Sequence, residues 1–498
     1  MASAPPGHIP GGPFGVGAVY PLAVSDRAPF IIFGGGPCGL AAAWQLCQFG
    51  EKPIVIEREP LVGGLCATHE RDGWRFDLGG HRFVSGDAAL SRWLEKLLGD
   101  DLLSAERRSI VLYRSRRFRY PLEAVDLVRN LGVRENARVI AGWAAARVRA
   151  HLRPHAEQSF EDWVTSRFGR PLYEAFFGPY TRKLWGLDPS LISADWAQER
   201  ISLLDLRDVA LRMMRLRRTP VRTYARHYRY PRLGMGQLYR TMAADVVSRG
   251  GEIRAATRVV GLEATGERVT AVLVDGTRGA ERIPAGEILS TLPLPELARM
   301  LRPDTPAAID AAARRLRFRA LAFVNLMLAR RDFSDSTWMY VASGDLTMSR
   351  IQEPKRRSPF MAPEGRTSLM LEVPCDVGDR TWKASDAELR TRMLSELDAL
   401  GLPVRDVLSS FVVRVTHGYP VYHLGYERDR QALLAEVASF ANVRSAGRQG
   451  LFRYVFMDAA MQMGMKAAMQ MLAGERGGAG IDAIGRSTRV IEAGALTA

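Results

Sequence analysis

The stretch IIFGGGPCGL at residues 31–40 constrains the fold of this 498-residue chain more than any other feature. A β-rich apolar run breaks into glycines spaced G-x-G-x-x-G from Gly34 to Gly39, and a helix-forming run, AAAWQLCQFG, follows at once. Such a turn lets the backbone approach a pyrophosphate, and the N-terminus of the following helix attracts the anion. A second apolar run, IVI, ends at Glu57, where an acidic side chain accepts ribose hydroxyls. The pattern predicts a βαβ dinucleotide-binding unit rather than an ordinary strand–turn–helix.

Two further glycine pairs follow this unit. The stretch LVGGLCATHERDGWRFDLGGHRF (61–83) carries one pair on each side of a Trp- and Phe-containing segment, which predicts a hairpin. A glycine pair admits backbone where a side chain would collide with a ligand. The next segment, SGDAALSRWLEKLLG, predicts a capped amphipathic helix from residue 85 to about residue 100.

The rest of the chain changes pattern twice. Residues 120–220 carry apolar side chains at helical spacing, whereas the sequence from Gly251 alternates like strands, and 318–375 predicts a sheet. The final third reads as strand RVTHGYPVY, helix RDRQALLAEVASF, strand NVRSAG and the Met-rich helix MDAAMQMGMKAAMQML. We interpret its methionines as core, because Met fills irregular gaps. A dinucleotide unit interrupted in this way predicts a discontinuous cofactor domain.

The chain is basic, with a net charge of +15, but only six of its 69 basic residues are lysine. Such a charge suits an anionic partner, while the arginine bias can equally reflect genome composition. The densest basic stretch, RMMRLRRTPVRTYARHYRYPR (212–232), fits an anionic-substrate mouth, a membrane contact or a solvated segment, and the sequence does not decide among them. No nucleic-acid-binding motif accompanies it, so we do not expect nucleic acid as a partner.

Four scattered cysteines without a C-x-x-C pair predict neither a metal site nor a disulfide framework. The N-terminal residues lack a signal-peptide pattern, and no uncharged apolar run approaches the roughly 20 residues that span a bilayer. We therefore expect a cytoplasmic protein, with peripheral membrane contact left open. The sequence does not indicate an oligomeric state.

Several stretches together resemble the FAD-dependent amine oxidase and protoporphyrinogen oxidase-like family, which also includes phytoene desaturases and UDP-galactopyranose mutases. The glycine turn, the Gly63-Gly64 pair and DLGGHRF resemble the FAD-binding opening of this family. The stretches PYTRKLWG (179–186), YPRLGMGQLYRTM (230–242), SRIQEPK (349–355), GYPVY (418–422) and GRQGLFRY (447–454) resemble the galactopyranose mutase branch in order and spacing.

The resemblance implies an α/β protein. We expect a discontinuous, glutathione-reductase-like FAD-binding dinucleotide fold with an inserted helical segment and a substrate-binding sheet domain. The expected parts are a flexible tail at 1–26, an FAD-binding domain at 27–110, 228–298 and 440–490, a helical insertion at 111–227 and a substrate-binding domain at 299–439.

The same resemblance implies site residues. The residues implied for FAD are Gly34, Gly36, Pro37, Cys38, Gly39, Glu57, Arg58, Gly63, Gly64, Gly80, His81, Val259, Gly447 and Asp458. Those implied for the substrate are Tyr180, Trp185, Arg200, Arg350, Tyr422, Arg448 and Tyr454, with His81, Arg350, Tyr422, Arg448 and Tyr454 expected to take part in catalysis. Forked guanidinium groups and phenols suit a diphosphate, and an indole offers a stacking face. No metal ligand is implied.

One departure from the family bears on function. After Tyr454, where close relatives carry an Asn-Asn-Gln-Asp-His run, this chain reads VFMDAAMQMG, which keeps Asp458 and makes the floor of the site more apolar. We therefore expect an FAD-dependent oxidoreductase of the dehydrogenase, oxidase or desaturase type, acting on a small organic substrate in biosynthesis. The alternative is a non-redox, flavin-dependent nucleotide-sugar mutase, in which the arginines hold an anionic substrate. A flavoprotein that only binds a partner is a third, weaker alternative.

Overall fold

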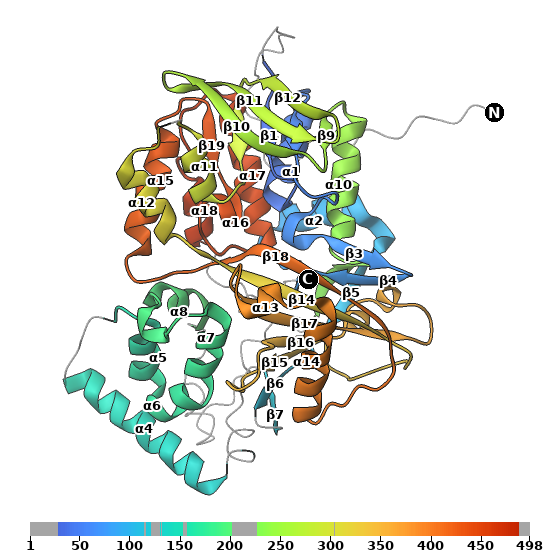
Figure 1. Ribbon diagram of the computed structural model, residues 1–498, viewed down its shortest axis with the longest axis vertical. Coiled ribbons are helices and arrows are strands. Elements are labelled where there is room, and N and C mark those ends of the chain that lie inside the picture. Colours follow the sequence, from blue (N-terminus) through green and yellow to red (C-terminus); the bar gives the residue numbers. More distant parts are fainter. Residues whose placement is uncertain are drawn as a thin grey trace.

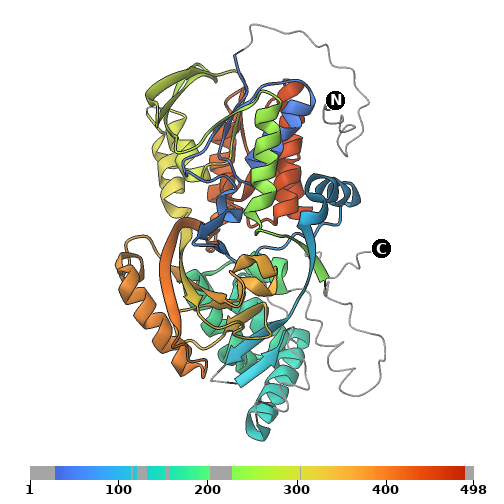
Figure 2. The same ribbon diagram turned by 90° about the vertical axis from the view of Figure 1, so that its right-hand side faces the viewer.

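The computed structural model describes residues 28–487, apart from 114–115, 121–129, 131, 153–156, 202–226 and 303. The expected N-terminal tail and most of the arginine-rich stretch at 212–232 lie outside the described residues. Two lobes are visible: one carries α1, α10 and α17, and the other carries β14–β18 together with the helices α4–α8 (Figure 1, Figure 2).

The first lobe is built on a five-stranded parallel sheet whose strands come from widely separated parts of the chain. Its order is β19-β13-β1-β2-β9. These strands are β1 (Ile31–Phe33), β2 (Ile54–Ile56), β9 (Glu252–Arg254), β13 (Ile288–Ser290) and β19 (Val443–Ser445). Each has three residues, and their apolar side chains are largely buried, as is typical of parallel sheets covered on both faces.

Successive side chains of β1 point to opposite faces of the sheet and belong to two different parts of the core. Ile32 packs with residues of α1 (Pro37–Gln48), α10 (Gly236–Ser248) and α17 (Met457–Leu472). Its neighbours Ile31 and Phe33 pack instead with the antiparallel sheet of β10 (Arg258–Thr265), β11 (Arg268–Gly276) and β12 (Gly279–Pro284), and with the helices α11 (Leu294–Met300), α12 (Ala307–Arg315) and α15 (Tyr426–Ala438). The period of two in a strand thus places helices on one face and a mixed layer on the other.

Helices α1 and α17 approach each other unusually closely. A Cβ atom on Gly464 of α17 would lie 2.0 Å from the carbonyl oxygen of Cys38 in α1. The methionines Met461, Met463 and Met465 of α17 are buried in the same core. The Met-rich helix is therefore a core helix that seats α1, as its composition predicts.

The second lobe is built on a seven-stranded sheet of order β18-β14-β17-β16-β15-β6-β7. Its strands are β6 (Ser109–Tyr113), β7 (Arg116–Arg119), β14 (Phe318–Leu328), β15 (Trp338–Val341), β16 (Arg350–Gln352), β17 (Thr367–Cys375) and β18 (Val407–Pro420). One face packs on α14 (Asp386–Ala399), and the other packs on aromatic residues of the helices between 160 and 201.

The beginning of the expected helical insertion needs correction. We assigned 111–227 to helices, but β6 and β7 pair with each other, and β6 joins β15 in the seven-stranded sheet. The boundary at residue 110 would therefore cut through β6. Apolar and polar residues alternate in SIVLY and RRFR, which is a strand pattern. The first of these segments pairs with β15 as a strand.

The remaining elements complete the two lobes. Two short hairpin-like sheets pair β3 (Thr68–Arg71) with β4 (Trp74–Asp77) and β5 (Leu102–Glu106) with β8 (His227–Pro231). The other helices are α2 (Ala88–Leu98), α4 (Val133–Leu152), α5 (Phe160–Phe168), α6 (Arg170–Leu172), α7 (Gly178–Trp185), α8 (Ala194–Ile201), α13 (Arg380–Lys383), α16 (Gly447–Gly450) and α18 (Ile481–Ser487). In the part of the chain that the structure describes, no helix is long and apolar enough to cross a membrane.

We expect Gly464→Ala to destabilise the protein by about 1–3 kcal/mol, because the added methyl group must push α17 away from α1. The free energy of unfolding in urea measures this cost. Gly478→Ala is the matched control, since a Cβ there meets only ordinary contacts at 3.5 Å or more. Equal stability of the two variants would contradict the close approach.

Candidate functional site

The glycine turn forms a cradle at the carboxyl end of β1. Gly34 adopts a φ of +98°, and a Cβ there would lie 2.2 Å from Oγ1 of Thr291. Gly36 is the N-cap of α1, no side chain caps it, and Pro37 occupies the first turn. The N-terminus of α1 therefore offers its backbone N–H groups and its dipole to an anion.

Glu57 is fixed at the edge of this cradle. Its Oε2 accepts a hydrogen bond from the Gly35 N–H at 2.7 Å, and its Oε1 accepts one from the Glu59 N–H at 2.8 Å. Burial raises the pKa of this carboxyl. Each oxygen keeps a lone pair for a further donor, which suits ribose hydroxyls. The neighbouring Arg58 is exposed and pairs with Glu59.

The second glycine pair faces the first turn. A Cβ on Gly64 would lie 3.3 Å from Cα of Gly36, and the Gly63 N–H donates to the Gly35 carbonyl at 2.8 Å. Two stretches of backbone thus pack directly against each other, and a side chain on Gly64 would crowd Gly36. The contact fixes the glycine turn at the head of α1, where backbone N–H groups can meet a dinucleotide phosphate.

Gly80 and His81 lie where the two lobes meet. A Cβ on Gly80 would lie 1.4 Å from Cζ3 of Trp338 in the seven-stranded sheet. His81 Nε2 lies 2.9 Å from the Leu78 carbonyl, and Nδ1 lies 3.8 Å from Sγ of Cys66. Burial lowers the pKa of His81 to about 4, so the ring is neutral at pH 7. A neutral ring that donates from Nε2 to a carbonyl orients this segment, and we do not expect it to accept a proton from the substrate.

Four further residues that we expected to bind FAD are buried: Cys38, Gly447, Asp458 and Val259. Cys38 and Gly447 meet where a Cβ on the glycine would lie 3.1 Å from Cβ of the cysteine. Asp458, in the first turn of α17, is buried, and burial raises its pKa while a hydrogen bond with Ser85 lowers it. Val259 is buried with the apolar residues of β10–β12, so its side chain contributes to the core of this lobe.

The substrate side is organised around a buried ion pair. Arg350 Nη1 donates to Oε1 of Glu372 at 2.7 Å and to the hydroxyl of Tyr419 at 2.7 Å. Glu372 is fully buried, and Arg350 retains 14% side-chain exposure. The guanidinium lies 5.5 Å from the ring centroid of Trp338 and 6.0 Å from that of Tyr340. The cation is thus neutralised by a carboxylate and surrounded by aromatic faces.

A wall of aromatic rings continues from this pair. Tyr419 stacks on Tyr454 with a distance of 5.8 Å between the ring centroids. The guanidinium of Arg448 lies over the Tyr454 ring, 4.3 Å from its centroid. Arg448 donates to the Val455 carbonyl at 2.9 Å. Trp185 packs edge-on against Tyr419 at 5.8 Å. The stack therefore joins the two arginines that the sequence singles out.

Tyr180 and Arg200 are the two other residues that we predicted for the substrate site. Tyr180 lies beside Tyr340, and burial raises the pKa of its hydroxyl to about 12. Arg200 belongs to α8, but its side chain lies outside the described residues.

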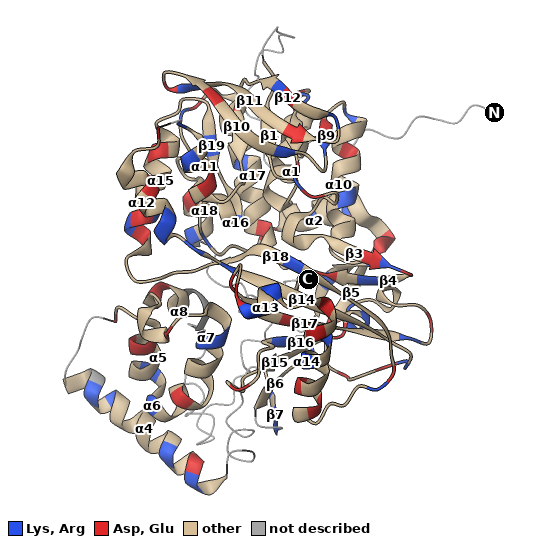
Figure 3. Cartoon of the chain, in the orientation of Figure 1, with Lys and Arg blue, Asp and Glu red and all other residues tan. Residues whose placement is uncertain are grey.

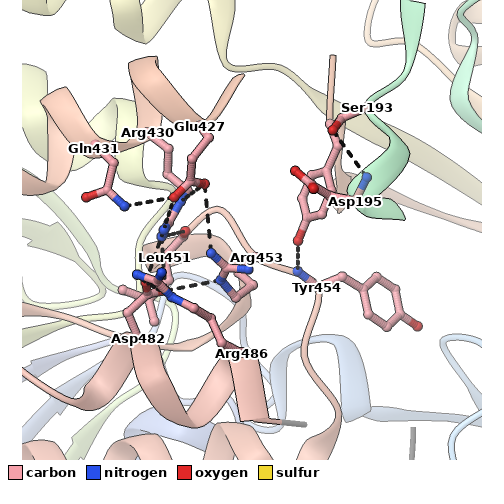
Figure 4. A network of polar contacts seen from close by, with 11 residues as sticks. Ser193, Asp195, Glu427, Arg430, Gln431, Leu451, Arg453, Tyr454, Asp482 and Arg486 are labelled. Carbon is pink, nitrogen blue, oxygen red and sulfur yellow. Dashed lines mark hydrogen bonds and ion pairs between the residues drawn. The ribbon is translucent and has the colours of Figure 1, made fainter. Parts of the chain in front are cut away.

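Tyr422 lies behind the aromatic wall rather than in it. Its side chain is 1% exposed, its ring stacks on Tyr426 at 4.4 Å, and its hydroxyl accepts a hydrogen bond from the Tyr454 N–H at 2.8 Å (Figure 4). The structure thus places Tyr422 as a support for Tyr454, not as a residue that contacts substrate. Tyr419, in the same GYPVY stretch, takes the position we expected for Tyr422.

A buried ionic network holds the segment that precedes Tyr454. Arg430 pairs with Glu427 at 2.8 Å and with Asp482 at 3.0 Å, and Arg453 donates to Asp482 at 3.1 Å (Figure 4). Burial alone would raise the pKa of Asp482, but the arginines lower it to about 2. The network ties α15 and α18 to the segment that precedes Tyr454.

Residues that the sequence did not single out complete the site: Trp196, Trp338, Tyr340, Glu372 and Tyr419. Glu372 has a signal in the sequence, because it is the single charged residue of the apolar strand TSLMLEVPC and a buried carboxylate needs a partner. The aromatic residues have no such signal, since the spacing of a strand does not tell which face meets the cofactor.

A glycine turn at the head of a helix, with an acidic residue at the end of the next strand, is the geometry of a dinucleotide-binding unit. The family model of flavin containing amine oxidoreductase matches residues 37–472, and the chain belongs to this family. The cofactor is therefore FAD.

Individual relatives are distant. Phytoene dehydrogenase from Streptomyces griseus is 25% identical over 75% of this chain and 79% of its own length. Protoporphyrinogen oxidase 1 from Spinacia oleracea is 28% identical over 35% of this chain and 32% of its own length. Among solved structures, reduced UDP-galactopyranose mutase matches with a TM-score of 0.76 and 22% identity over 92% of this chain and 98% of that chain. Cyclohexylamine oxidase from Brevibacterium oxydans matches with a TM-score of 0.64 and 16% identity, over 90% and 99%. The structural likenesses show the fold.

We expect Glu372→Leu to destabilise the protein by about 3 kcal/mol, because it leaves a largely buried guanidinium without its carboxylate. The double variant Arg350→Met/Glu372→Leu should recover most of this loss, as urea unfolding in a double-mutant cycle would show. The exposed pair Arg405–Asp398 is the matched control, where the same cycle should give less than about 1 kcal/mol. Additive costs at Arg350 and Glu372 would contradict the buried pair.

His81 should make stability depend on pH. Its folded pKa of about 4 lies below the roughly 6.5 of an unfolded histidine, so between these values the unfolded chain binds a proton that the folded chain does not. Stability is therefore lost as the pH falls from about 6.5 to 4. Between pH 7 and pH 5 the wild type should lose about 1–2 kcal/mol more than His81→Gln, with His227→Gln as the control at an exposed ring. Parallel pH profiles for all three proteins would exclude a buried neutral His81.

Proposed function

We propose that this enzyme oxidises a small, uncharged, largely apolar organic substrate in a biosynthetic reaction. The observation that carries the proposal is the pairing of Arg350 with the fully buried Glu372. A guanidinium that already has a carboxylate gains little from a second anion, because its charge is balanced in a site of low dielectric. Aromatic rings make up most of the surrounding wall.

FAD supplies the redox chemistry by accepting a hydride from a C–H bond of the substrate. The residues of the chain bind and orient the two partners. The Gly34–Gly36 turn and Glu57 hold the dinucleotide, and Gly80 lets Trp338 approach the segment next to His81. Tyr454 is half-buried and offers a flat face on which a conjugated substrate can lie, while the buried Tyr419 and Trp185 pack behind it and hold it in place.

One relative supports this substrate class by analogy. Phytoene dehydrogenase is named for an uncharged, apolar hydrocarbon, and it matches this chain in sequence. The apolar stretch after Tyr454 and the paired Arg350 agree with such a substrate. We therefore favour dehydrogenation or desaturation over the oxidation of a charged amine.

The second candidate is the nucleotide-sugar mutase. The fold of reduced UDP-galactopyranose mutase supports it, as do Arg350 and Arg448 on either side of the Tyr419–Tyr454 stack. That function needs a diphosphate bound to arginine, and here one Nη of Arg350 is held by Glu372 and Tyr419. The redox function therefore agrees better with the contacts of this site.

Anaerobic titration of the oxidised holoenzyme tests the proposal. A polyene hydrocarbon should bleach the flavin band near about 450 nm, because hydride transfer reduces the cofactor. A primary amine and a UDP-hexose are the parallel samples. Conversion of the UDP-hexose to an isomer by prereduced enzyme, with no bleaching by any reductant substrate, would establish the mutase and overturn our proposal.

Binding of UDP provides an independent test. If the site took a diphosphate, Arg350→Ala and Arg448→Ala would each weaken UDP binding by roughly 2–5 kcal/mol. We expect instead weak binding to the wild type and a change below about 1 kcal/mol in either variant, measured by quenching of flavin or tryptophan fluorescence. A large loss in both variants would favour the mutase.

A further inference from the structure

Helix α4 is apolar on two opposite sides. Its inner side packs on the neighbouring helices, and a Cβ on Gly142 would lie 2.4 Å from Cδ of Pro171. Its outer side carries apolar residues at intervals of three or four, which places them on one stripe of a helix. We call this stripe the α4 outer face; it consists of Val133, Ala137, Ile140, Ala144, Val148 and Leu152.

The α4 outer face is strongly exposed. Val133 is 87% exposed, Leu152 is 72% exposed, and Ile140 and Val148 both exceed one half. Among the described residues, twelve large apolar side chains are exposed, and these four lie together on one helix. Single exposed apolar residues need no explanation, whereas a contiguous stripe marks an interaction surface.

Arginines flank this stripe. Arg134, Arg138 and Arg149 lie on one side of it along the helix, and Arg147 lies on the other (Figure 3). In the part of the chain that the structure describes, none of the four forms an ion pair with a carboxylate. The only acidic residue of the helix is Glu135, which is half-buried. The surface thus combines an apolar stripe with unbalanced positive charge.

We propose that the α4 outer face docks this enzyme on the surface of an anionic lipid bilayer. An amphipathic helix with arginines beside an apolar face lies in the plane of the interface, with its apolar residues at the acyl-chain boundary and its cations at the phosphates. The position of α4 at the outer end of its lobe, away from the five-stranded sheet, leaves this face accessible to a flat surface (Figure 1, Figure 2).

Other occupants fit the charge less well. A second copy of the chain, bound through the same face, would bring two sets of four arginines together. An anionic bilayer supplies both an apolar layer and the opposite charge. This inference goes beyond the proposed oxidation and does not depend on it.

Co-sedimentation of the holoenzyme with vesicles tests the inference. The wild type should bind vesicles of phosphatidylcholine with phosphatidylglycerol at least tenfold better than vesicles of phosphatidylcholine alone, and raising the salt from about 0.1 M to about 1 M should weaken the binding. The triple variant Ile140→Ser/Val148→Ser/Leu152→Ser should lose at least tenfold in partitioning. Arg134→Gln/Arg138→Gln/Arg149→Gln should lose about fivefold for each arginine.

Two matched controls guard against general effects. Val260→Ser/Val377→Ser/Leu408→Ser removes three equally exposed apolar side chains elsewhere, and Arg331→Gln/Arg405→Gln/Arg476→Gln removes three exposed arginines. Both should bind like the wild type, and all variants should retain FAD and the wild-type circular dichroism. No binding of the wild type to anionic vesicles, or equal losses in the α4 and control variants, would overturn the proposal. So would a change of oligomeric state in the α4 variants without lipid, which would assign the face to self-association.

Discussion

The close approach of backbone at the head of α1 is the constraint on which the rest of the structure depends. Gly36 and Gly64 come within reach of each other because neither carries a side chain, and Gly34 occupies a conformation that other residues adopt at a cost. This contact fixes the glycine turn against the head of α1. A third glycine, Gly464, lets α17 pack closely on α1 at Cys38.

The substrate side follows a different principle. Here a cation is placed in a largely apolar wall, and its cost is offset by Glu372 and by the hydroxyl of Tyr419. The pair balances the charge of Arg350, and the rings of Trp338, Tyr340 and Tyr419 surround it. Arg350 thus stands in the environment of a buried ion pair.

Sequence reasoning can predict a cofactor site here because the predicted residues are local. Gly34, Gly36, Gly39 and Glu57 fall within one βαβ unit, and short-range spacing sets their relative positions. The same reasoning placed the strands and the Met-rich helix correctly but assigned β6 and β7 to a helical insertion. Their strand pattern is short, and their partner β15 lies more than 200 residues away. The family resemblance implied Tyr422, whereas the structure shows that Tyr419 is the tyrosine of this stretch that contacts Arg350.

The sequence by itself indicated a dinucleotide-binding unit, because glycine and acidic residues at fixed intervals have few other physical uses, and its resemblance to the family implied FAD. Only the tertiary structure decided that Arg350 is neutralised, that burial keeps His81 neutral, and that Tyr422 supports Tyr454. These properties arise from contacts between strands and helices far apart in the chain. Burial and charge balance depend on such contacts, and no local pattern encodes them.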